Sequence, residues 1–304
     1  MILCVTPNPA IDRTLHVDAL RVGEVHRSDT VLAAAGGKGL NVARTIRALG
    51  GSPFCVGLLG GHTGNLLAEL AEREGLSAHW TRMKNETRTC VILVEHSRDA
   101  TVVNERGAGV SADECQIFLR DVWAQAEQAQ PVCVSGSLPP GFSLDDFSIL
   151  LQGLAARKKS VWVDTSGAAL KTALDVRGVN IKVNAAELGE ALGLEIFTME
   201  QAANAGRQLL ERGISSVAVT LGRDGAVLVA GTGVWSVHPP AIEVVSSVGS
   251  GDAFLGGLAF ALETGNPPEV ALRYGVAAGA ANALHFGGGM VEREEFSKVY
   301  KATF

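Results

Sequence analysis

The chain has 304 residues, of which 47% are hydrophobic, 19% charged and 5% aromatic. This length and composition describe a globular protein with a large buried core, and they exclude a disordered or fibrous chain. The net charge of −6 argues against nucleic acid as the main partner, because proteins that bind a phosphate backbone present a basic face.

The cysteines and the start of the chain bear on the cellular location. The five cysteines are an odd number and form no C-x-x-C pair, so we expect reduced, mostly buried thiols and no metal bound through sulfur. The sequence begins with a strand-like segment rather than a targeting signal, and no run of about 18 apolar residues follows. We therefore expect a cytoplasmic protein that does not contact membranes.

Strand-like and helix-like segments alternate along most of the chain. Short apolar runs predict strands at residues 2–5, 54–59, 132–134, 160–163, 181–183, 217–221 and 226–229. Helical periodicity predicts helices at residues 39–49, 64–74, 112–128, 144–157, 199–212, 252–263 and 276–284. This alternation predicts an α/β fold with a mainly parallel sheet covered by helices on both faces, in one large domain or two smaller ones.

Two segments interrupt the alternation. Residues 13–33 and 86–104 contain strand patterns without intervening helices, so they predict a small β-sheet that stands off the main one. Each segment leaves and rejoins the core beside polar residues, which favours a lid over a cleft, although two ordinary hairpins would give the same pattern. We expect a core of residues 1–11, 34–85 and 105–304, and a lid of residues 12–33 and 86–104.

The most informative motif is the run Val248-Gly249-Ser250-Gly251-Asp252, where an apolar segment gives way to a helix. Glycines let the backbone amides turn toward an oxyanion, and the start of a helix adds partial positive charge. Asp252 then lies within reach of the anion and can accept the proton of an attacking hydroxyl. The alternative is a plain turn in which Asp252 caps the helix.

Polar residues near the N-terminus predict a second part of the same site. Asp12 follows the first strand, where open α/β sheets bind ligands, and its carboxylate can accept bonds from two hydroxyl groups. The glycine-rich loop with Gly37, Lys38 and Asn41 leads into a helix but is no Walker A loop, because no Ser or Thr follows the lysine. Asp12 as a turn residue and Asn41 as a helix cap are the alternatives.

Two arginines in the interrupting segments are candidate phosphate clamps. Arg27 and Arg88 lie one on each segment, and a guanidinium can bind phosphate oxygens through two parallel hydrogen bonds. Most surface arginines have no such role, but a place on a lid favours it. Ser137, in a small polar turn after another strand, is a candidate wall of the cleft.

Downstream residues suit a nucleotide. Asn184 and Glu187 are three residues apart at an expected helix start and could hold a hydrated Mg²⁺ through water, or could form a capping box instead. Thr220, Gly222 and Gly225 follow a strand and could pass under a nucleotide, although a tight hairpin turn is the alternative.

The order of these motifs resembles the PfkB carbohydrate kinase family, which has the ribokinase-like fold, over essentially the whole chain. The segment 36–41 resembles the first signature of that family and 249–252 its second. The segments 8–12, 39–44, 87–88 and 135–141 are closer to its hexose-phosphate branch, the 1-phosphofructokinases and tagatose-6-phosphate kinases. The chain departs from the family pattern at Val183, where proline is common, and at Val102 and Val103, where the branch often has an acidic residue.

The resemblance implies a three-layer αβα core with a β-sheet lid, and transfer of phosphate from ATP to fructose 1-phosphate, tagatose 6-phosphate or fructose 6-phosphate. It implies Mg²⁺ as the essential ion and leaves room for a monovalent cation such as K⁺. The implied roles are these: Asp252 as catalytic base; the amides of Gly249, Ser250 and Gly251 as anion hole; Asp12, Gly37 and Asn41 on the sugar; Arg27 and Arg88 on its phosphate; Asn184 and Glu187 at Mg²⁺; Lys182, Thr220, Gly222 and Gly225 beside the nucleotide; and Asn282 at the adenosine.

Other functions fit the sequence less well. A kinase of an unphosphorylated sugar or nucleoside would not need Arg27 and Arg88, and a non-catalytic sugar-phosphate sensor would not need the base. A dinucleotide oxidoreductase would show G-x-G-x-x-G after the first strand, which this chain lacks. Apolar lid residues such as Val17, Val91 and Leu93 predict a homodimer formed through the lids.

Overall fold

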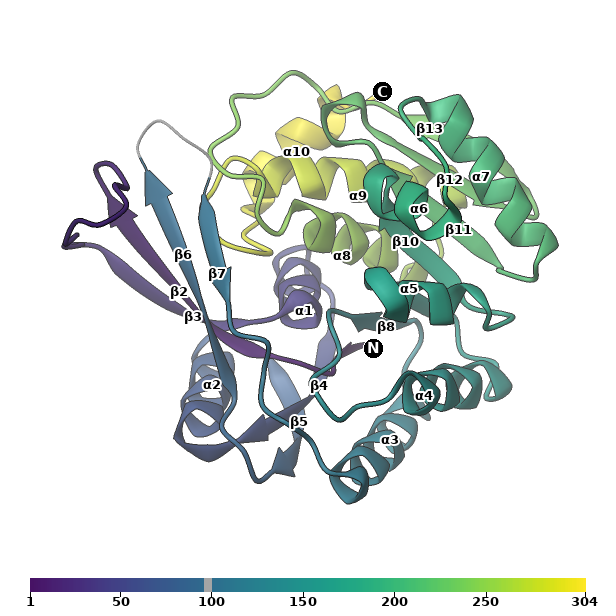
Figure 1. Ribbon diagram of the computed structural model, residues 1–304. Helices are drawn as coiled ribbons and strands as arrows, with labels where there is room; N and C mark the ends of the chain where they lie inside the picture. The colour runs from purple at the N-terminus through teal and green to yellow at the C-terminus, as the bar shows by residue number, and fades with distance from the viewer. Residues whose placement is uncertain (96–99) are drawn as a thin grey trace.

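The computed structural model describes residues 1–95 and 100–304, and their strands form two separate sheets (Figure 1). Within these residues the larger sheet has nine strands in the order β13-β12-β11-β10-β9-β8-β1-β4-β5. The strands β11, β10, β9, β8, β1, β4 and β5 pair in parallel, whereas β12 and β13 are antiparallel additions at one edge. Their bounds are β1 Ile2–Thr6, β4 Pro53–Gly60, β5 Ser77–Met83, β8 Val132–Ser135, β9 Val161–Asp164, β10 Asn180–Asn184, β11 Ser216–Thr220, β12 Ala226–Ala230 and β13 Gly233–Val237.

Helices cover both faces of this sheet (Figure 1). On one face lie α3 Ala112–Ala126, α4 Leu144–Ala156, α5 Gly167–Leu174, α6 Ala185–Leu192 and α7 Met199–Glu211. On the other lie α1 Lys38–Ala48, α2 Gly61–Arg73, α8 Ser250–Glu263 and α9 Pro268–Asn282, with α10 Arg293–Ala302 packed outside α9. Among the helices of the described residues, none is long and apolar enough to cross a membrane.

The central strand β1 shows why its sequence is a continuous apolar run. Successive side chains of a strand point to opposite faces, so a strand covered on both faces needs apolar residues throughout. Leu3 and Val5 belong to the core under α3 and α4, whereas Ile2 and Cys4 belong to the core under α1 and α8. All five cysteines are buried free thiols, as we expected from their number and spacing.

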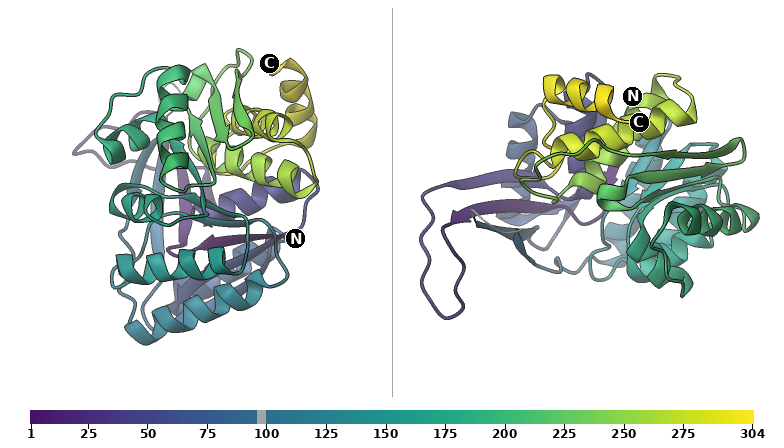
Figure 2. Two further views of the ribbon diagram at one scale, coloured as in Figure 1. Left: turned by 90° about the vertical axis from the view of Figure 1, so that its right-hand side faces the viewer. Right: turned by 90° about the horizontal axis from the view of Figure 1, so that it is seen from above.

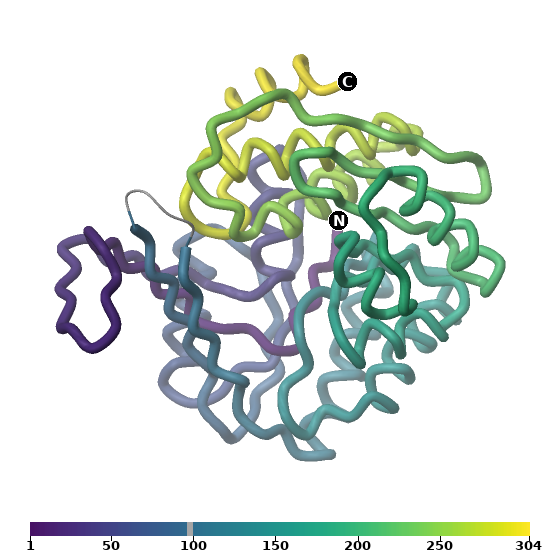
Figure 3. Tube along the Cα trace, turned by 45° about the horizontal axis from the view of Figure 1, so that its top comes forward, coloured from purple at the N-terminus to yellow at the C-terminus, as the bar shows by residue number. Residues whose placement is uncertain are grey.

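The smaller sheet stands away from the main body (Figure 2). Its order is β3-β2-β6-β7, with bounds β2 Ala10–Val17, β3 Val31–Gly36, β6 Arg88–Glu95 and β7 Thr101–Asn104. The pair β2 and β6 is parallel, and the two outer pairs are antiparallel. Residues 18–30 join β2 to β3 in a loop that extends beyond the sheet, drawn in purple in Figure 3. The strands β2 and β3 continue to residues 10 and 36, past the expected bounds of 12–33, because their pairing persists up to the start of α1.

The predicted fold class is confirmed, because a mostly parallel sheet lies between two helix layers and a second sheet stands beside it. Sequence patterns missed β5, β13, α5 and α10, and they predicted only the start of α6. The edge strand β5 is largely polar and only partly buried, α5 and α6 have eight residues each, and α10 has few buried positions. One expected surface residue is buried: Val17 is 5% exposed, so it presents no face to a partner.

Candidate active site

The turn into α8 brings backbone and positive charge together. Gly249 takes a left-handed φ of 79°, and a Cβ on it would overlap with the Cα of Gly288. A Cβ on Gly251 would lie 2.6 Å from Nζ of Lys182, so glycine leaves room for that ammonium group. The amide of Ser250 donates to the carbonyl of Ser247 at 3.2 Å, so this member of the expected anion hole is bonded to the chain. The remaining positive character of the turn comes from the helix start and Lys182.

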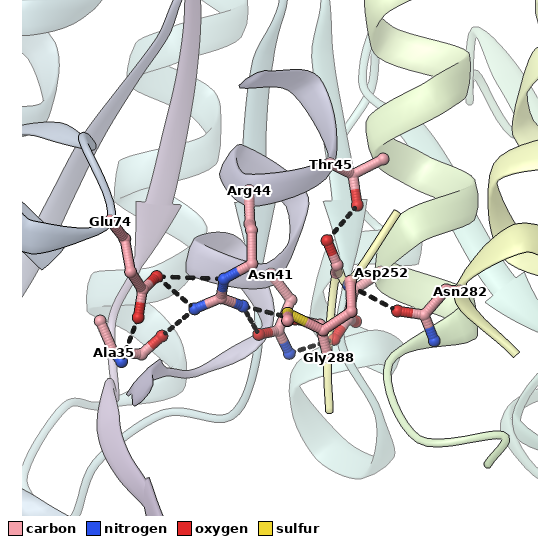
Figure 4. A network of polar contacts seen from close by, with 10 residues as sticks. Ala35, Asn41, Arg44, Thr45, Glu74, Asp252, Asn282 and Gly288 are labelled. Atoms are coloured by element: carbon pink, nitrogen blue, oxygen red, sulfur yellow. Dashed lines mark hydrogen bonds and ion pairs between the residues drawn. The ribbon is translucent and has the colours of Figure 1, made fainter. Parts of the chain in front are cut away.

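Asp252 lies in the first turn of α8 and is 6% exposed. Its Oδ2 accepts a hydrogen bond of 2.8 Å from Nδ2 of Asn41 on α1 (Figure 4). Burial raises the pKa of the Asp252 carboxyl to about 6, and Asp164 adds to the rise, whereas Lys38, Lys182 and the Asn41 bond lower it. The carboxyl is therefore poised to exchange a proton near neutral pH.

Two lysines flank a buried carboxylate beside Asp252. Nζ of Lys38 lies 2.7 Å from Oδ1 of Asp164, and Nζ of Lys182 lies 2.8 Å from Oδ2. Burial alone would raise the pKa of Asp164, but Lys182 and Lys38 hold it below its ordinary value. Burial alone would lower the pKa of Lys38, but Asp164 and Asp252 raise it above its ordinary value. The Lys38 ammonium group thus stays charged, and it lies with Lys182 where an anion at the α8 turn can be neutralised.

Asp12 lies on β2, directly against the glycine-rich loop. A Cβ on Gly36 would overlap with its carboxyl group, and the backbone N–H of Gly37 donates to it. Burial raises the pKa of Asp12 to about 6; Arg44 and Arg88 oppose the rise, and Asp252 adds to it. The two carboxyl groups therefore influence each other, so a hydroxyl bound by Asp12 would be near the base.

Arg88 and Ser137 meet through Asn8. Nε and Nη2 of Arg88 donate to the carbonyl of Asn8 at 3.2 and 3.0 Å, and Nη1 donates to the carbonyl of Glu105 at 2.9 Å. Nδ2 of Asn8 donates to Oγ of Ser137 at 3.1 Å. The three hydrogen bonds that Arg88 donates use three of the five N–H groups of its guanidinium, so two N–H groups remain for a ligand.

Arg27 is not near these residues within one chain. It is exposed and belongs to the loop beyond β2 and β3. The register pairs Ala10 with Gly36 at the end of the small sheet near α1, and Leu15 with Val31 toward the loop. Arg27 therefore lies at the far end of the small sheet from the Gly36 and Gly37 loop.

The residues expected at a nucleotide gather at the ends of β10 and β11. Asn184 and Glu187 form a capping box, in which Oδ1 of Asn184 accepts from the Glu187 amide at 2.8 Å and Oε2 of Glu187 accepts from the Asn184 amide at 3.2 Å. Asn184 pairs in register with Thr220, and Gly222 and Gly225 have φ of 59° and 102°. An open hollow of about 530 Å³ has Asn184, Thr220, Gly222, Leu194, Phe197 and Leu221 among its lining. A second hollow, between α2 and β5, contains none of the expected residues.

Asn282 is fully buried, and both ends of its amide bond to the chain. Nδ2 donates to the carbonyl of Val248 at 2.9 Å and to Oγ of Ser250 at 3.3 Å, and Oδ1 accepts from the amide of Met290 at 2.9 Å. The amide thus links the α8 turn to the loop after α9, and the expected contact with adenosine stays a prediction. The amide of Asn41 is likewise bonded at both ends, to Asp252 and Arg44.

Sequence reasoning missed Asp164, Arg44 and the loop 287–289. Asp164 ends an expected strand, which is where an α/β sheet places ligand-binding groups, so its position was a usable signal. The three consecutive glycines at 287–289 also indicate close packing, and a Cβ on Gly288 would overlap with the Asn41 amide. Arg44 gave no signal, because its contacts with Glu74 and Gly288 join segments that are distant in sequence.

The residues beside the expected nucleotide position could hold a hydrated metal ion. Each capping-box oxygen of Asn184 and Glu187 keeps a free lone pair beyond its one bond. Over the described part of the chain, no group of three or more His, Cys, Asp or Glu side chains could form a metal site. This donor set fits Mg²⁺, which keeps several waters and is held mainly by nucleotide phosphates.

A buried carboxylate at a helix start, with two ammonium groups beside it, defines a phosphotransferase: the carboxylate can take a proton while the cations face a phosphoryl group. The chain belongs to the pfkB family of carbohydrate kinases, whose family model matches residues 5–293.

Relatives and solved structures agree with this assignment. The chain is 36% identical to a 1-phosphofructokinase of Haloferax volcanii over 91% of this chain and 88% of the relative. It is 31% identical to a 1-phosphofructokinase of Bacillus subtilis over 93% of each. Its structure matches the tetrameric inhibited form of phosphofructokinase-2 from Escherichia coli with a TM-score of 0.91 and 28% identity, over 99% of this chain and 98% of that one. Structures of the same E. coli protein with fructose 6-phosphate and with potassium match at a TM-score of 0.90.

Proposed function

We propose that the chain transfers the γ-phosphoryl group of ATP to a hexose phosphate and forms a hexose bisphosphate. The observation that carries this proposal is the buried Asp252, held by Asn41 and facing Lys38 and Lys182 at the start of α8. The kinase family and the two relatives named 1-phosphofructokinase support it.

In the proposed reaction, Asp252 accepts the proton of a free hydroxyl on the sugar, and that oxygen attacks the γ-phosphorus in line. The bond from the γ-phosphorus to the bridging oxygen breaks, and ADP leaves with its electron pair. Lys38, Lys182 and the helix start stabilise the charge of the transferring group, which is where most of the catalysis in phosphoryl transfer arises.

Fructose 1-phosphate is the favoured acceptor, because the Haloferax volcanii and Bacillus subtilis relatives are both named 1-phosphofructokinase. Tagatose 6-phosphate and fructose 6-phosphate remain candidates, the latter because the E. coli phosphofructokinase-2 has been solved with it. Asp12 would hold the sugar hydroxyls, and Arg88, with two N–H donors left over, would hold the existing phosphate.

The nucleotide would lie along the ends of β10 and β11. Thr220, Gly222 and Gly225 would line it, and Asn184 and Glu187 would hold hydrated Mg²⁺ through water. Mg²⁺ bound there would supply positive charge that neutralises the nucleotide phosphates. A monovalent cation is a further proposal, supported by the potassium complex of E. coli phosphofructokinase-2.

We also propose a homodimer formed by the small sheets acting as lids. The outer strands β3 and β7 expose apolar side chains, with Leu32 54% and Val103 59% exposed. Arg27 lies at the far end of its own small sheet, so it can serve as a phosphate clamp only at the site of a second copy.

The proposal is tested by ADP release with ATP, Mg²⁺ and each of the three hexose phosphates, with fructose and ribose as unphosphorylated controls. We expect one hexose phosphate to give the highest kcat/KM and the free sugars to give little. Asp252→Asn should lower kcat by at least about 10²-fold while ATP still binds, since a positioned base contributes about 10²- to 10⁴-fold. Near-normal turnover of this variant, or no ADP release with any phosphosugar, would refute the proposal.

A further inference from the structure

Arg44 lies on α1, three residues after Asn41, and its guanidinium joins separate parts of the chain (Figure 4). Nε and Nη2 donate to Oε2 of Glu74 at 3.0 and 2.6 Å, and Nη2 also donates to the carbonyl of Ala35 at 2.7 Å. Nη1 donates to the carbonyl of Gly288 and, at 2.9 Å, to Oδ1 of Asn41. The side chain is 14% exposed, so these bonds are largely shielded from water.

This contact fixes which way the Asn41 amide faces. An asparagine amide accepts hydrogen bonds at its oxygen and donates them at its nitrogen, whereas a guanidinium can only donate. Nη1 of Arg44 must therefore face Oδ1 of Asn41. That arrangement turns Nδ2 toward Oδ2 of Asp252, 2.8 Å away. With the amide turned over, two donors would meet at Arg44 and two acceptors would meet at Asp252.

We propose that Arg44 is a positioning residue for phosphoryl transfer: by locking the Asn41 amide, it holds the Asp252 carboxylate ionised and in one orientation. The inference rests on the proposed function of Asp252 as base. Arg44 itself lies one residue removed from the reacting atoms, because its contact with Asp252 passes through Asn41.

The same guanidinium supports the anion-binding turn. Its bond to the Gly288 carbonyl holds the loop 287–289 in place, and Gly288 packs so closely on Gly249 that a Cβ on Gly249 would overlap with it. Arg44 thus braces both the base and the turn that precedes it.

The charges that face Asp252 determine what the loss of this bond would do. Lys38 and Lys182 favour the ionised carboxylate, and Asp164 and Asp12 oppose it. The N–H of Asn41 favours the ionised form as well, because hydrogen bonding to a charged group stabilises it. Without the bond, Asp252 should therefore take up its proton at a higher pH.

The first test is Arg44→Lys, which keeps the positive charge near Asp12 and Glu74 but replaces the fork of donors by one ammonium group. We expect kcat/KM for the phosphosugar to fall about tenfold to 10²-fold, as for other losses of positioning. We expect the acid limb of its pH profile to move up by about one pH unit. Arg47→Lys is the matched control, because Arg47 lies on the exposed side of α1, and its profile should not move.

The second test asks whether Arg44 acts through Asn41. Asn41→Ala removes the donor directly, so it should move the acid limb by a similar amount. Arg44→Lys added to Asn41→Ala should then change kcat/KM by less than about threefold, because residues that act as a unit are not additive. Additive effects would overturn the proposal. So would an unmoved acid limb in Asn41→Ala, whatever the stability of the Arg44 variant.

These outcomes separate the two proposals. If Asp252→Asn keeps near-normal turnover, the base itself is wrongly placed and the proposed function fails. If Asp252→Asn is inactive while the two variants are additive, the proposed function stands and only the role of Arg44 is refuted.

Discussion

Gly36 leaves room for the carboxyl group of Asp12, which we propose binds the sugar. Any Cβ at this position would overlap with the Asp12 carboxyl, although the backbone there is in an ordinary conformation. The glycine therefore serves the carboxylate rather than the fold of the chain. Replacing Gly36 should affect sugar binding more than nucleotide binding, because the residues expected at the nucleotide lie at the ends of β10 and β11.

We expect Gly36→Ala to raise KM for the phosphosugar about tenfold to 10²-fold, the usual effect of losing a hydrogen bond to a charged group. KM for ATP should change little, and steady-state kinetics with each substrate varied in turn would measure both. Gly231→Ala is the control, since nothing lies within 4 Å of a Cβ there. An equal rise in both KM values would contradict the assignment of Asp12 to the sugar.

The two buried carboxyls at positions 12 and 252 predict the pH dependence. Burial raises the pKa of each to about 6, and each must be ionised to accept a proton or a hydroxyl bond. We expect kcat/KM to fall below about pH 6, with a slope of log kcat/KM steeper than one per pH unit because two interacting groups titrate. Asp12→Asn should reduce the slope to about one. An unchanged slope would show that the ionisation of Asp12 does not contribute to the pH dependence of kcat/KM.

The free energy of unfolding should depend on pH with the opposite sign to the activity. A folded pKa near 6 exceeds the value of about 3.9 for an unfolded aspartate, so the folded chain binds more protons in this range. The contribution of these two groups to stability is present below about pH 4 and is lost as the pH rises through about 6. The proposed activity therefore requires the ionised carboxylates of Asp12 and Asp252, whereas burial in the folded chain favours their protonated forms.

At residue level, the sequence indicated the groups that do chemistry better than the groups that support them. Asp252 follows a glycine at a helix start, Asp12 follows the first strand, and Lys182 lies within an apolar strand, so local sequence patterns point to all three. Arg44 has no such setting: it is one of several charged residues on a helix, and its partners lie 30 and 244 positions away. Its role depends on contacts that only the folded chain creates.

Three elements meet at Asp164. It ends β9, Lys182 lies on the neighbouring strand β10, and Lys38 begins α1. Asp164 is fully buried, so its charge is compensated by the lysines rather than by water. The ion pairs thus connect the start of α1 to the carboxyl ends of two strands on the catalytic side of the sheet.

We expect Asp164→Asn to lower the free energy of unfolding by about 3 kcal/mol, because it leaves Lys182 buried without its counter-charge. Chemical denaturation followed by circular dichroism would measure the loss. Asp175→Asn breaks an exposed pair with Arg212 and should change stability by no more than about 0.5 kcal/mol. Equal losses in the two variants would show that the buried ion pairs of Asp164 contribute no more to the free energy of unfolding than the exposed pair of Asp175.

At element level, every expected strand and helix exists, and the bounds differ by a few residues, except that α9 begins at Pro268 rather than at residue 276. Long, strongly apolar segments were predictable because burial on both faces demands such composition. The missed β5 is an edge strand with only partial burial, so its pattern is mixed. The short α5 and α6 are stabilised by packing against the core more than by their own periodicity.

Over the whole molecule, the small sheet is the part that points to assembly. Its outer strands expose Leu32 and Val103, and the loop beyond them exposes Val22 and Val25. Apolar side chains gathered on one projecting element are costly in water and favour pairing. Association through these strands would also bring Arg27 to the site of the second copy, where we propose it binds the phosphate of the sugar.

We expect a dimer in solution at micromolar concentration, measured by sedimentation velocity. Leu32→Lys should shift the population toward monomer. It should also raise KM for the phosphosugar, because Arg27 would no longer reach the site of a second copy. Ile149→Lys, at a similarly exposed position on α4, should leave both unchanged. A monomeric parent chain, or a Leu32→Lys dimer as tight as the parent, would contradict assembly through the small sheets.

The sequence predicted the architecture of the whole molecule but not how far the small sheet projects. Hydrophobic periodicity reports which residues are buried, so it located both sheets and the helix layers. It carries no information on the reach of the loop 18–30, which placed Arg27 away from the cleft. Sequence patterns alone therefore grouped the two arginines that the folded chain separates.

The proposed base, Asp252, lies on a late helix, whereas Asp12 and Asn41 come from the first part of the chain. During synthesis, the Asp12 carboxylate and the glycine-rich loop leave the ribosome roughly two hundred residues before residue 252, and proteins of this size generally fold from the N-terminus as they emerge. A nascent chain that has not yet reached α8 has no proton acceptor at this place. Under the proposed mechanism it can therefore assemble much of its sheet without consuming nucleotide, and turnover begins only when about the last fifth of the chain, from α8 onward, has joined the rest.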